Sequence, residues 1–297
     1  MKPLPLLLAA LFLAGCAAPR EVRRALPAGP PVAEAPSSAP VWPANAPSLA
    51  AQSAIMIDAR SGEVLFQKNA DERRVPASTQ KLLTALLITR RGNLDAPVTI
   101  MPEDTRVEPT KLGLRPGEQY TRRELLQSLM VKSSNDACAA LARDHSGTEG
   151  AFVENMNRAA YSLGARNSYF VNSHGLPANQ FSTARDIARI AFRAYRDPVL
   201  RRMMQQRVVY FRHNSGRVTR LEATNKLLER SPAFNGMKTG YTDAAGRCLV
   251  SSGRLNGREV ILVQLRSRTK YIFDDAQRLM AWSGRGNYYG GTSYATF

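Results

Sequence analysis

The chain has 297 residues, of which 44% are hydrophobic and 22% are charged, a composition typical of a globular protein with one substantial core or two small ones. Its formal net charge of +17 favours contact with an anionic partner, such as nucleic acid, a membrane surface or an acidic wall polymer. The arginines are scattered instead of alternating with aromatic residues, so we expect no nucleic-acid partner. The three cysteines and three histidines lack the spacing of metal ligands, so we expect no metal and no cofactor.

The first 15 residues are predicted to form a secretion signal, because a basic residue precedes a short apolar run that ends in small residues. This run is too short to span a bilayer. The segment Leu13-Ala14-Gly15-Cys16 resembles the lipobox of bacterial lipoproteins, which implies that Cys16 becomes the lipid-modified first residue of the mature protein. The resemblance implies an exported protein, lipid-anchored in the bacterial cell envelope and facing the periplasm. Ala17 favours the outer membrane if the host is Gram-negative.

Residues 16–48 are rich in proline and alanine and are predicted to be an extended linker. The folded domain is expected over residues 49–283. Periodicity and turn residues predict strands at 53–58, 63–67, 98–101, 208–211, 234–240, 248–252 and 259–265, and helices from 76, at 121–131, from 135, and at 149–163, 183–195 and 274–282. Residues 284–297 are predicted to be disordered. Strands at both ends with helices between them indicate an α+β fold, an antiparallel sheet packed with helices plus a mainly helical subdomain.

The chain is organised around the segment that follows Pro76, where Ser78 and Lys81 precede a leucine-rich helical pattern. Residues three apart share one face of a helix, so this hydroxyl and this amine can lie within hydrogen-bond reach. A serine hydroxyl is a poor nucleophile at neutral pH, and a neighbouring amine with a lowered pKa can take its proton. The pair is therefore a candidate nucleophile and base, although an isolated Ser-x-x-Lys also recurs by chance.

Two further short motifs follow, Ser133-Ser134-Asn135 in a predicted turn between helices and Lys238-Thr239-Gly240 in a predicted strand. Each alone has a structural explanation, because Ser and Asn also cap helices and a lysine at a strand edge discourages aggregation. Together, in this order and in these contexts, the three motifs favour a joint catalytic site.

This order of motifs resembles that of the penicillin-binding proteins and serine β-lactamases. The longer strings at 133–138, 174–176 and 236–246 resemble the low-molecular-mass penicillin-binding proteins that are serine-type D-alanyl-D-alanine carboxypeptidases. The resemblance covers roughly residues 53–282. It implies the penicillin-recognising serine-peptidase fold, peptidoglycan stem peptides as substrate and β-lactams as covalent inhibitors.

The resemblance also implies a role for each motif residue in an acyl-enzyme reaction. Ser78 is expected to attack the carbonyl between two D-alanines, with Lys81 as general base. The backbone N–H groups of Ser78 and Tyr241 are expected to hold the oxyanion. Ser133 is expected to pass a proton to the leaving amine, and Asn135 to orient Lys81 and the substrate amide.

The third motif is expected to bind substrate. Lys238 and Thr239 are expected to face the terminal carboxylate, and Gly240 to let the peptide lie close against the strand edge. Many carboxypeptidases of the family carry an arginine before the Phe that opens the final helix, whereas Ile272 precedes Phe273 here. We therefore expect looser discrimination for a free carboxyl terminus.

Three alternatives remain open from the residues. A D-alanyl-D-alanine endopeptidase of the same family is favoured by the strings at 245–250 and 270–271, which resemble that branch. A β-lactamase of the glutamate-assisted type is disfavoured, because no convincing Glu-x-x-x-Asn loop follows the second motif. A non-catalytic wall-binding lipoprotein is disfavoured by the intact Ser78 and Lys81. Cys138 is predicted to be a buried thiol, and whether Cys248 pairs with it is left open.

Overall fold

The structure, a computed structural model, describes residues 45–285. The predicted signal segment, Cys16, the linker up to residue 44 and the tail 286–297 lie outside the described residues. Among residues 45–285, none of the helices combines the length and the apolar character that crossing a bilayer requires.

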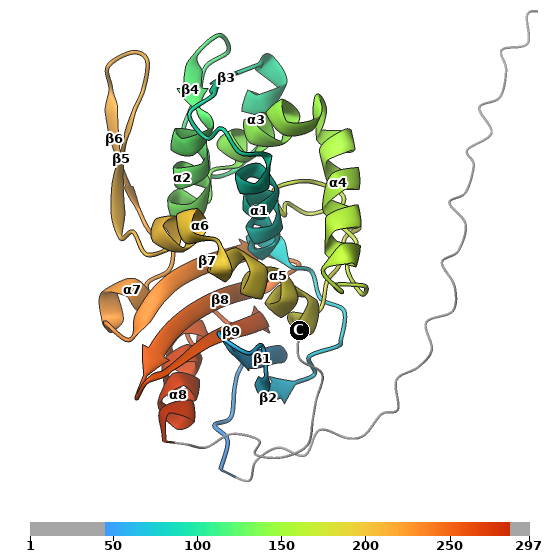
Figure 1. Cartoon of the computed structure of the whole chain (residues 1–297), viewed down its shortest axis with the longest axis vertical. Helices are drawn as coiled ribbons and strands as arrows, with labels where there is room; N and C mark the ends of the chain where they lie inside the picture. The colour runs from blue at the N-terminus through green and yellow to red at the C-terminus, as the bar shows by residue number, and fades with distance from the viewer. Residues whose placement is uncertain (1–44, 286–297) are drawn as a thin grey trace, which may run out of the picture. The chain divides into compact units, whose positions relative to one another are not determined.

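Strands lie toward both ends of this part of the chain, with most of the helices between them (Figure 1). The strands are β1 Ser53–Asp58, β2 Val64–Lys68, β3 Pro97–Thr99, β4 Gln119–Thr121, β5 Val208–Arg212, β6 Val218–Glu222, β7 Phe234–Thr242, β8 Gly246–Leu255 and β9 Arg258–Ser267. The α-helices are α1 Lys81–Arg91, α2 Arg122–Lys132, α3 Asn135–Ser146, α4 Glu149–Ser162, α5 Ala184–Arg196, α6 Pro198–Met204, α7 Leu227–Arg230 and α8 Ile272–Gly284. Two 3₁₀ turns, η1 Ala77–Gln80 and η2 Pro102–Arg106, complete the order.

Five strands form one antiparallel sheet in the order β2-β1-β9-β8-β7. The predicted turn at Asn256-Gly257 joins β8 to β9, and both turn residues have the positive φ that a tight hairpin turn requires. Strand β7 lies at one edge of the sheet, where it pairs with β8 and has no strand of the described residues on its other side. This edge strand carries the Lys-Thr-Gly motif, and 3₁₀ turn η1 packs against it.

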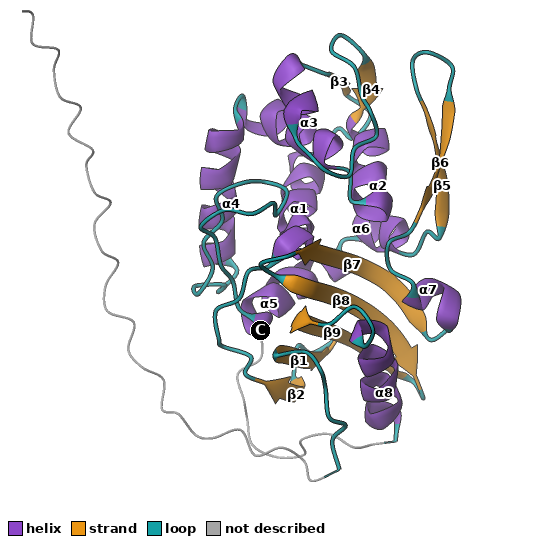
Figure 2. Ribbon diagram, turned by 180° about the vertical axis from the view of Figure 1, so that it is seen from behind, coloured by secondary structure: helices purple, strands orange, loops and turns teal. Residues whose placement is uncertain are grey.

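Helices bury both faces of the sheet. In β1 the side chains alternate, with Ile55 and Ile57 in the core shared with α1 and α5 and with Met56 in the core under α8. Figures 1 and 2 show α8 on one side of the sheet and α5 with the other helices on the opposite side. Two packed faces explain why the central strands β1 and β9 are buried along most of their length instead of alternating between buried and exposed residues.

Helix α1 lies at the centre of the helical part and packs against α2, α3, α4 and α5. Its first leucines, Leu82 and Leu83, are fully buried, as the spacing predicts. The hairpin of β5 and β6 stands apart from the main sheet, alongside α2 (Figure 2). Its base leads back to the Lys-Thr-Gly strand through the segment around Thr224.

The predicted α+β fold is confirmed, and so is the capping box that starts α2. The Thr121 hydroxyl accepts a hydrogen bond from the Glu124 N–H, and the Glu124 carboxylate accepts one from the Thr121 N–H, at 3.2 and 2.8 Å. The prediction stops α5 at Asp197-Pro198, but these residues also begin α6. Asp197 caps that helix and Pro198 occupies its first turn, where a missing N–H costs nothing.

Strands β4 and β6 and helix α7 are further elements that the sequence does not predict. Each is short, and β6 contains only one buried residue, Leu221, in a largely polar segment. None of them therefore has a strong periodic signal in its sequence.

Candidate active site

Ser78 and Lys81 are brought together by a 3₁₀ turn instead of the first turn of an α-helix. Residues three apart eclipse each other in a 3₁₀ helix, so the Lys81 side chain lies directly against the serine. The Lys81 Nζ is 2.9 Å from the Ser78 Oγ. Ala77, just before the serine, has a φ of +48°, a conformation that costs a residue with a side chain about 1 to 2 kcal/mol. The backbone is therefore strained where it presents the hydroxyl.

The Lys81 amine has three oxygen partners. Besides Ser78, its Nζ lies 2.7 Å from the Asn135 Oδ1 and 2.7 Å from the main-chain oxygen of His174. A neutral amine has two N–H groups and one lone pair. Asn135 and His174 can accept the two N–H groups, which leaves the lone pair facing the Ser78 O–H. The geometry therefore suits a proton transfer from Ser78 to Lys81.

Burial makes this amine more available as a base near neutral pH. The Lys81 side chain is fully buried, and this desolvation lowers the pKa of Lys81 from 10.5 to about 8. Cys138 lies nearby in α3, but burial raises the pKa of its thiol to about 11, so the thiol is neutral at pH 7 and adds no charge. At pH 7 about a tenth of Lys81 is thus unprotonated, compared with less than about a thousandth for an ordinary lysine.

The Ser133-Ser134-Asn135 turn between α2 and α3 brings the second motif to the same place. Ser133 ends α2 in the left-handed conformation, with a φ of +69°, and its N–H donates to the carbonyl of Leu129. The Ser133 Oγ accepts a hydrogen bond from the Lys238 Nζ at 2.8 Å. The side-chain amide of Asn135 donates to the carbonyl of Pro109, which fixes the Asn135 Oδ1 toward Lys81.

The third motif lies along edge strand β7. Lys238 is fully buried, and burial together with the neighbouring positive charge of Lys81 holds the pKa of Lys238 well below its ordinary value. Its Nζ also donates to its neighbour's carbonyl, that of Thr239, at 2.9 Å. The Thr239 Oγ1 lies 2.6 Å from the Thr224 Oγ1 at the base of the β5–β6 hairpin. The structure thus brings the first and second motifs together through Lys81 and Asn135, and the second and third through Ser133 and Lys238.

Gly240 has a structural role that the sequence does not predict. A Cβ at this position would lie 2.8 Å from the backbone nitrogen of Ser78 and 3.0 Å from the Cβ of Ala77. The missing side chain therefore lets η1 approach the strand, and the expectation that it also lets a substrate peptide lie close stays a prediction. Gly175 presses on the same turn from another side, since its Cβ would lie 2.1 Å from the Ala77 oxygen.

The Tyr241 side chain points away from the three motifs. Its ring is 49% exposed, its hydroxyl donates to Asp243 at 2.8 Å, and the Arg247 guanidinium stacks on it at 4.3 Å. The part expected to act is the backbone N–H, which does not depend on this side chain.

Sequence reasoning missed two partners of the motif residues. One is the His174 carbonyl, which accepts from Lys81 and whose oxygen lies 3.3 Å from the Ser78 Oγ. A main-chain oxygen carries no sequence signal, and the His174-Gly175-Leu176 string was noted only as part of a resemblance. The other is Thr224, whose hydroxyl meets Thr239 from a segment far away in the sequence.

A protein-family model described as D-alanyl-D-alanine carboxypeptidase matches residues 41–269. The chain belongs to this family. It is 34% identical to the D-alanyl-D-alanine carboxypeptidase DacF of Bacillus subtilis over 74% of this chain and 58% of that protein. It is 33% identical to a D-alanyl-D-alanine endopeptidase of Pseudomonas aeruginosa over 86% of this chain and 85% of that protein. The chain thus spans less than two thirds of the Bacillus relative and most of the Pseudomonas one.

Solved structures agree with this membership of the carboxypeptidase family. The fold matches a D-alanyl-D-alanine carboxypeptidase of Mycobacterium tuberculosis with a TM-score of 0.78 at 31% identity, over 82% of this chain and 95% of that one. It matches a Streptomyces DD-transpeptidase with a TM-score of 0.76 at 29% identity, over 81% of this chain and 99% of that one. The penicillin-binding-protein fold expected from the motifs is therefore confirmed.

Within residues 45–285, no group of His, Cys, Asp and Glu is arranged to hold a metal ion.

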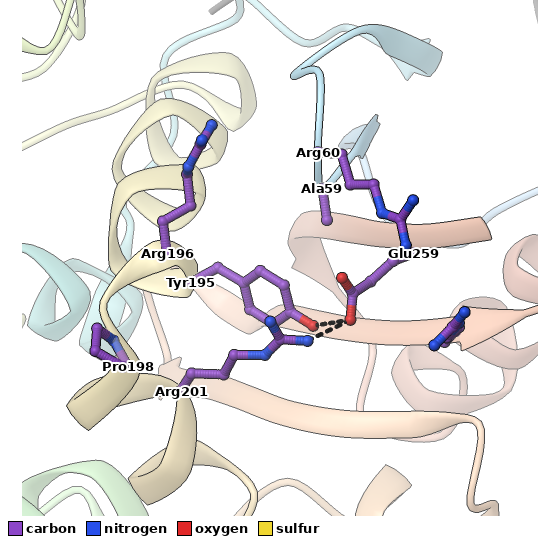
Figure 3. Close-up of a pocket in the computed structure, with 8 residues that line it drawn as sticks. Ala59, Arg60, Tyr195, Arg196, Pro198, Arg201 and Glu259 are labelled. Atoms are coloured by element: carbon purple, nitrogen blue, oxygen red, sulfur yellow. Dashed lines mark hydrogen bonds and ion pairs between the residues drawn. The ribbon is translucent and has the colours of Figure 1, made fainter. Parts of the chain in front are cut away.

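A second region of interest lies outside the motif cluster. A pocket of about 510 Å³ is lined by residues of α5, α6 and the β8–β9 end of the sheet, and none of the motif residues lines it (Figure 3). There the Glu259 carboxylate accepts a hydrogen bond from Tyr195 at 2.7 Å and pairs with Arg201, which ties α5 and α6 to β9.

Proposed function

We propose that the protein is a serine-type D-alanyl-D-alanine carboxypeptidase that trims peptidoglycan stem pentapeptides through an acyl-enzyme and binds penicillin covalently. One observation supports this proposal above the others. The Lys81 amine is fully buried, and its two acceptor partners leave its lone pair for Ser78. An amine held in this way supplies the base that a serine nucleophile needs.

In the proposed acylation, the Ser78 O–H gives its proton to Lys81 as the oxygen attacks the penultimate carbonyl. The carbonyl oxygen becomes an oxyanion. In the proposal, the backbone N–H groups of Ser78 and Tyr241 donate hydrogen bonds to it. The bond to the terminal D-alanine then breaks, and its nitrogen takes the proton of the Ser133 hydroxyl. The proton that Lys81 took from Ser78 passes on to the Ser133 oxygen, so Lys81 is neutral again before deacylation. Since the Ser133 oxygen accepts from Lys238, its own hydrogen is available for donation to the leaving nitrogen.

Deacylation repeats these steps with water. The water gives a proton to the same base and attacks the ester carbon, and the bond to the Ser78 oxygen breaks as that oxygen regains a proton. In the proposal, Lys238 and Thr239 bind the terminal carboxylate of the substrate before acylation, because both lie on the edge strand beside the second motif.

The test is covalent labelling. Intact-mass measurement of the purified protein after incubation with benzylpenicillin should show one adduct, and Ser78→Ala should show none. Digestion of pentapeptide muropeptides should release D-alanine with the same dependence on Ser78. An adduct that persists in Ser78→Ala would overturn the assignment, and a wild-type protein without any adduct would favour the non-catalytic wall-binding alternative.

A second activity is supported by a specific observation. The Pseudomonas relative named as an endopeptidase matches this chain over nearly its whole length. In addition, the arginine that many family members carry before the final helix is replaced by Ile272. The nearby cations Arg268 and Lys270 both lie over the Tyr271 ring, at 4.9 and 5.6 Å. We therefore propose that a free terminal carboxylate is gripped less firmly and that cross-links are also cleaved.

Initial rates on a monomeric pentapeptide muropeptide and on a cross-linked dimer decide between these substrates. A missing charge-assisted pair is typically worth ~1.5 to 3 kcal/mol, so we expect the two rates to lie within about a hundredfold of each other. If the dimer is untouched while the pentapeptide is trimmed, the looser grip is wrong.

The location is proposed from the family and from the first residues. A substrate in peptidoglycan supports an enzyme of the cell envelope, and the lipobox supports lipid attachment at Cys16. One acyl chain gives only marginal attachment, so stable anchoring requires a multiply acylated cysteine. Cys16→Ser should abolish labelling by a radioactive fatty acid and release the protein from membranes, whereas continued labelling would exclude Cys16 as the acceptor.

A further inference from the structure

The base Lys81 depends on an acceptor that belongs to a loop. Its Nζ donates to the main-chain oxygen of His174, which lies in the segment 172–176 between α4 and α5. A carbonyl in a loop has no regular ladder to hold it, so other contacts must fix its position. The distance of 2.7 Å between the Lys81 Nζ and this oxygen therefore rests on whatever anchors the loop.

The Glu149 carboxylate anchors the two loop residues nearest to that carbonyl. A single oxygen of this side chain, Oε1, accepts from the Ser173 N–H at 3.0 Å and from the Ser173 hydroxyl at 2.9 Å. The same Oε1 lies 3.5 Å from the His174 Nε2. Glu149 is the first residue of α4, so the anchor stands on a regular element outside the three motifs.

The hydrogen bonds of His174 determine which ring nitrogen carries its proton. Its Nδ1 accepts from the Leu176 N–H at 3.3 Å, so the proton of the neutral ring is on Nε2 and faces Glu149. The ring is neutral near pH 7 because burial, opposed by Glu149, lowers the pKa of His174 to about 4. The anchor therefore consists of the two hydrogen bonds from Ser173, in which Glu149 Oε1 is the acceptor, and the His174 Nε2–H faces the same oxygen at 3.5 Å.

We propose that Glu149 is a positioning residue of the active site, which holds the His174 carbonyl against Lys81 and thereby keeps the Lys81 amine buried and aimed at Ser78. The inference rests on the proposed function, because it concerns the base of that reaction. Its carboxylate acts through the loop and touches neither the nucleophile nor the base. An ordinary acidic residue at a helix start stabilises the helix only through the interaction of its charge with the helix dipole. Glu149 differs from such a residue because it also holds the loop.

Other titratable groups face Lys81 and must stay unchanged in a test. Cys138 approaches from α3, Lys238 lies beyond it on β7, and the His174 ring lies on the loop itself. Substitution of Glu149 leaves these three side chains in place. A change in the pH dependence of acylation then reports on the burial and contacts of Lys81.

Three variants of Glu149 separate hydrogen bonding from charge. Glu149→Gln keeps an oxygen at the Oε1 position without the charge. Glu149→Asp keeps the charge at the start of α4 but is too short to reach Ser173. Glu149→Ala removes both. Glu154→Ala is the matched control, because this glutamate lies in the same helix, has a side chain that is 73% exposed and pairs with the exposed Arg158.

The measurement is the second-order rate of acylation by a fluorescent penicillin as a function of pH, with thermal unfolding of every variant. We expect Glu149→Ala and Glu149→Asp to slow acylation by about tenfold or more, and Glu149→Gln and Glu154→Ala to stay within about threefold of the wild type. A loosened loop admits water to Lys81, so the midpoint of the acid limb should move from about 8 toward 10.5 in the Ala and Asp variants.

Contrary results are easily recognised. Unchanged midpoints in Glu149→Ala and Glu149→Asp, with a loss of rate that follows the loss of thermal stability, would overturn the proposal in favour of a merely structural residue. A slow Glu149→Gln beside a fast Glu149→Asp would overturn it in favour of the helix charge. If Glu149→Ala does not fold, the comparison of Glu149→Asp with Glu149→Gln still tests whether hydrogen bonding or charge is required. A wild-type protein that forms no adduct would overturn the proposed function, and this inference with it.

Discussion

Two fully buried lysines share one site, and their surroundings give them different tasks. Lys81 contacts two acceptors and the serine, so its lone pair is aimed. Lys238 contacts the Ser133 hydroxyl and a carbonyl, so it orients Ser133. Burial of each lysine disfavours its charged form, and the charge of Lys81 lowers the pKa of Lys238 further.

The lowered pKa of Lys81 predicts a pH dependence with a definite sign. The base must be unprotonated to accept the Ser78 proton, so acylation by penicillin should rise about tenfold per pH unit below about pH 8 and level off above it. Lys81→Arg should be inactive at every pH, since a guanidinium is not deprotonated in proteins. Stopped-flow acylation rates measure this limb. A flat profile between about pH 6 and about pH 9 would show that another group is the base.

Gly240 gives a second prediction at the same scale. In Gly240→Ala the new Cβ would meet the Ser78 nitrogen at 2.8 Å, so η1 must shift. We expect a loss of about 1 to 3 kcal/mol in the free energy of unfolding and a fall of about a hundredfold in acylation, because the nucleophile is displaced.

Gly150→Ala is the control for this glycine. Gly150 lies in α4 with no atom within 4 Å of the added Cβ, so alanine there should stabilise slightly and leave acylation unchanged. Urea unfolding and penicillin labelling of both variants measure the effects. A Gly240→Ala variant with the wild-type acylation rate would contradict the close approach of β7 and η1.

At the scale of elements, one carboxylate of α3 holds the segment that covers the second motif. Asp136 accepts hydrogen bonds from the N–H groups of Leu112, Gly113 and Leu114, at 3.0 to 3.3 Å, and is almost fully buried. The same segment carries Pro109, whose carbonyl accepts from the Asn135 amide. The residue after the Ser-Ser-Asn motif thus fixes the partner of the motif's asparagine.

Asp136→Ala should therefore loosen this segment. The backbone donors lose a buried acceptor, so we expect a loss of about 2 to 4 kcal/mol in the free energy of unfolding. Amide hydrogen exchange at residues 112–114 should become faster than the global rate. Asp95→Ala is the control, because its pair with Arg123 is on the surface and should contribute almost nothing. Unchanged exchange at 112–114 would contradict the anchoring.

The sequence predicts the long elements and the motif residues, because both have local signals. Leucine spacing and a capping box identify α1 and α2, and the Asn256-Gly257 turn identifies the β8–β9 hairpin. The missed parts depend on tertiary contacts. The His174 carbonyl has no residue-type signal, and Glu149 resembles any acid in a first helical turn. The contact between Gly240 and η1 has no local signal, because the packing of η1 against β7 joins segments distant in the chain.

At the scale of the whole described domain, one apolar core joins the helical part to one face of the sheet. Cys138 of α3 and Cys248 of β8 both belong to this core, one from each part. Both are free thiols and both are buried, so the pairing left open by the sequence is not formed in this structure. They contact different main-chain oxygens, those of Ser173 and Val75, respectively.

These two thiols therefore report whether the two parts unfold together. Burial raises the pKa of each thiol to about 11, so even near pH 8 only roughly one in a thousand is ionised, and native labelling by a thiol reagent should be negligible. Because a single core holds both residues, we expect them to become reactive at the same urea concentration, with equal opening free energies that match global unfolding. Mass spectrometry of peptides from a Cys16→Ser variant, labelled over a urea series, measures both sites at once. Exposure of Cys138 well before Cys248 would mean that the helical part opens on its own and that the shared core does not make unfolding cooperative.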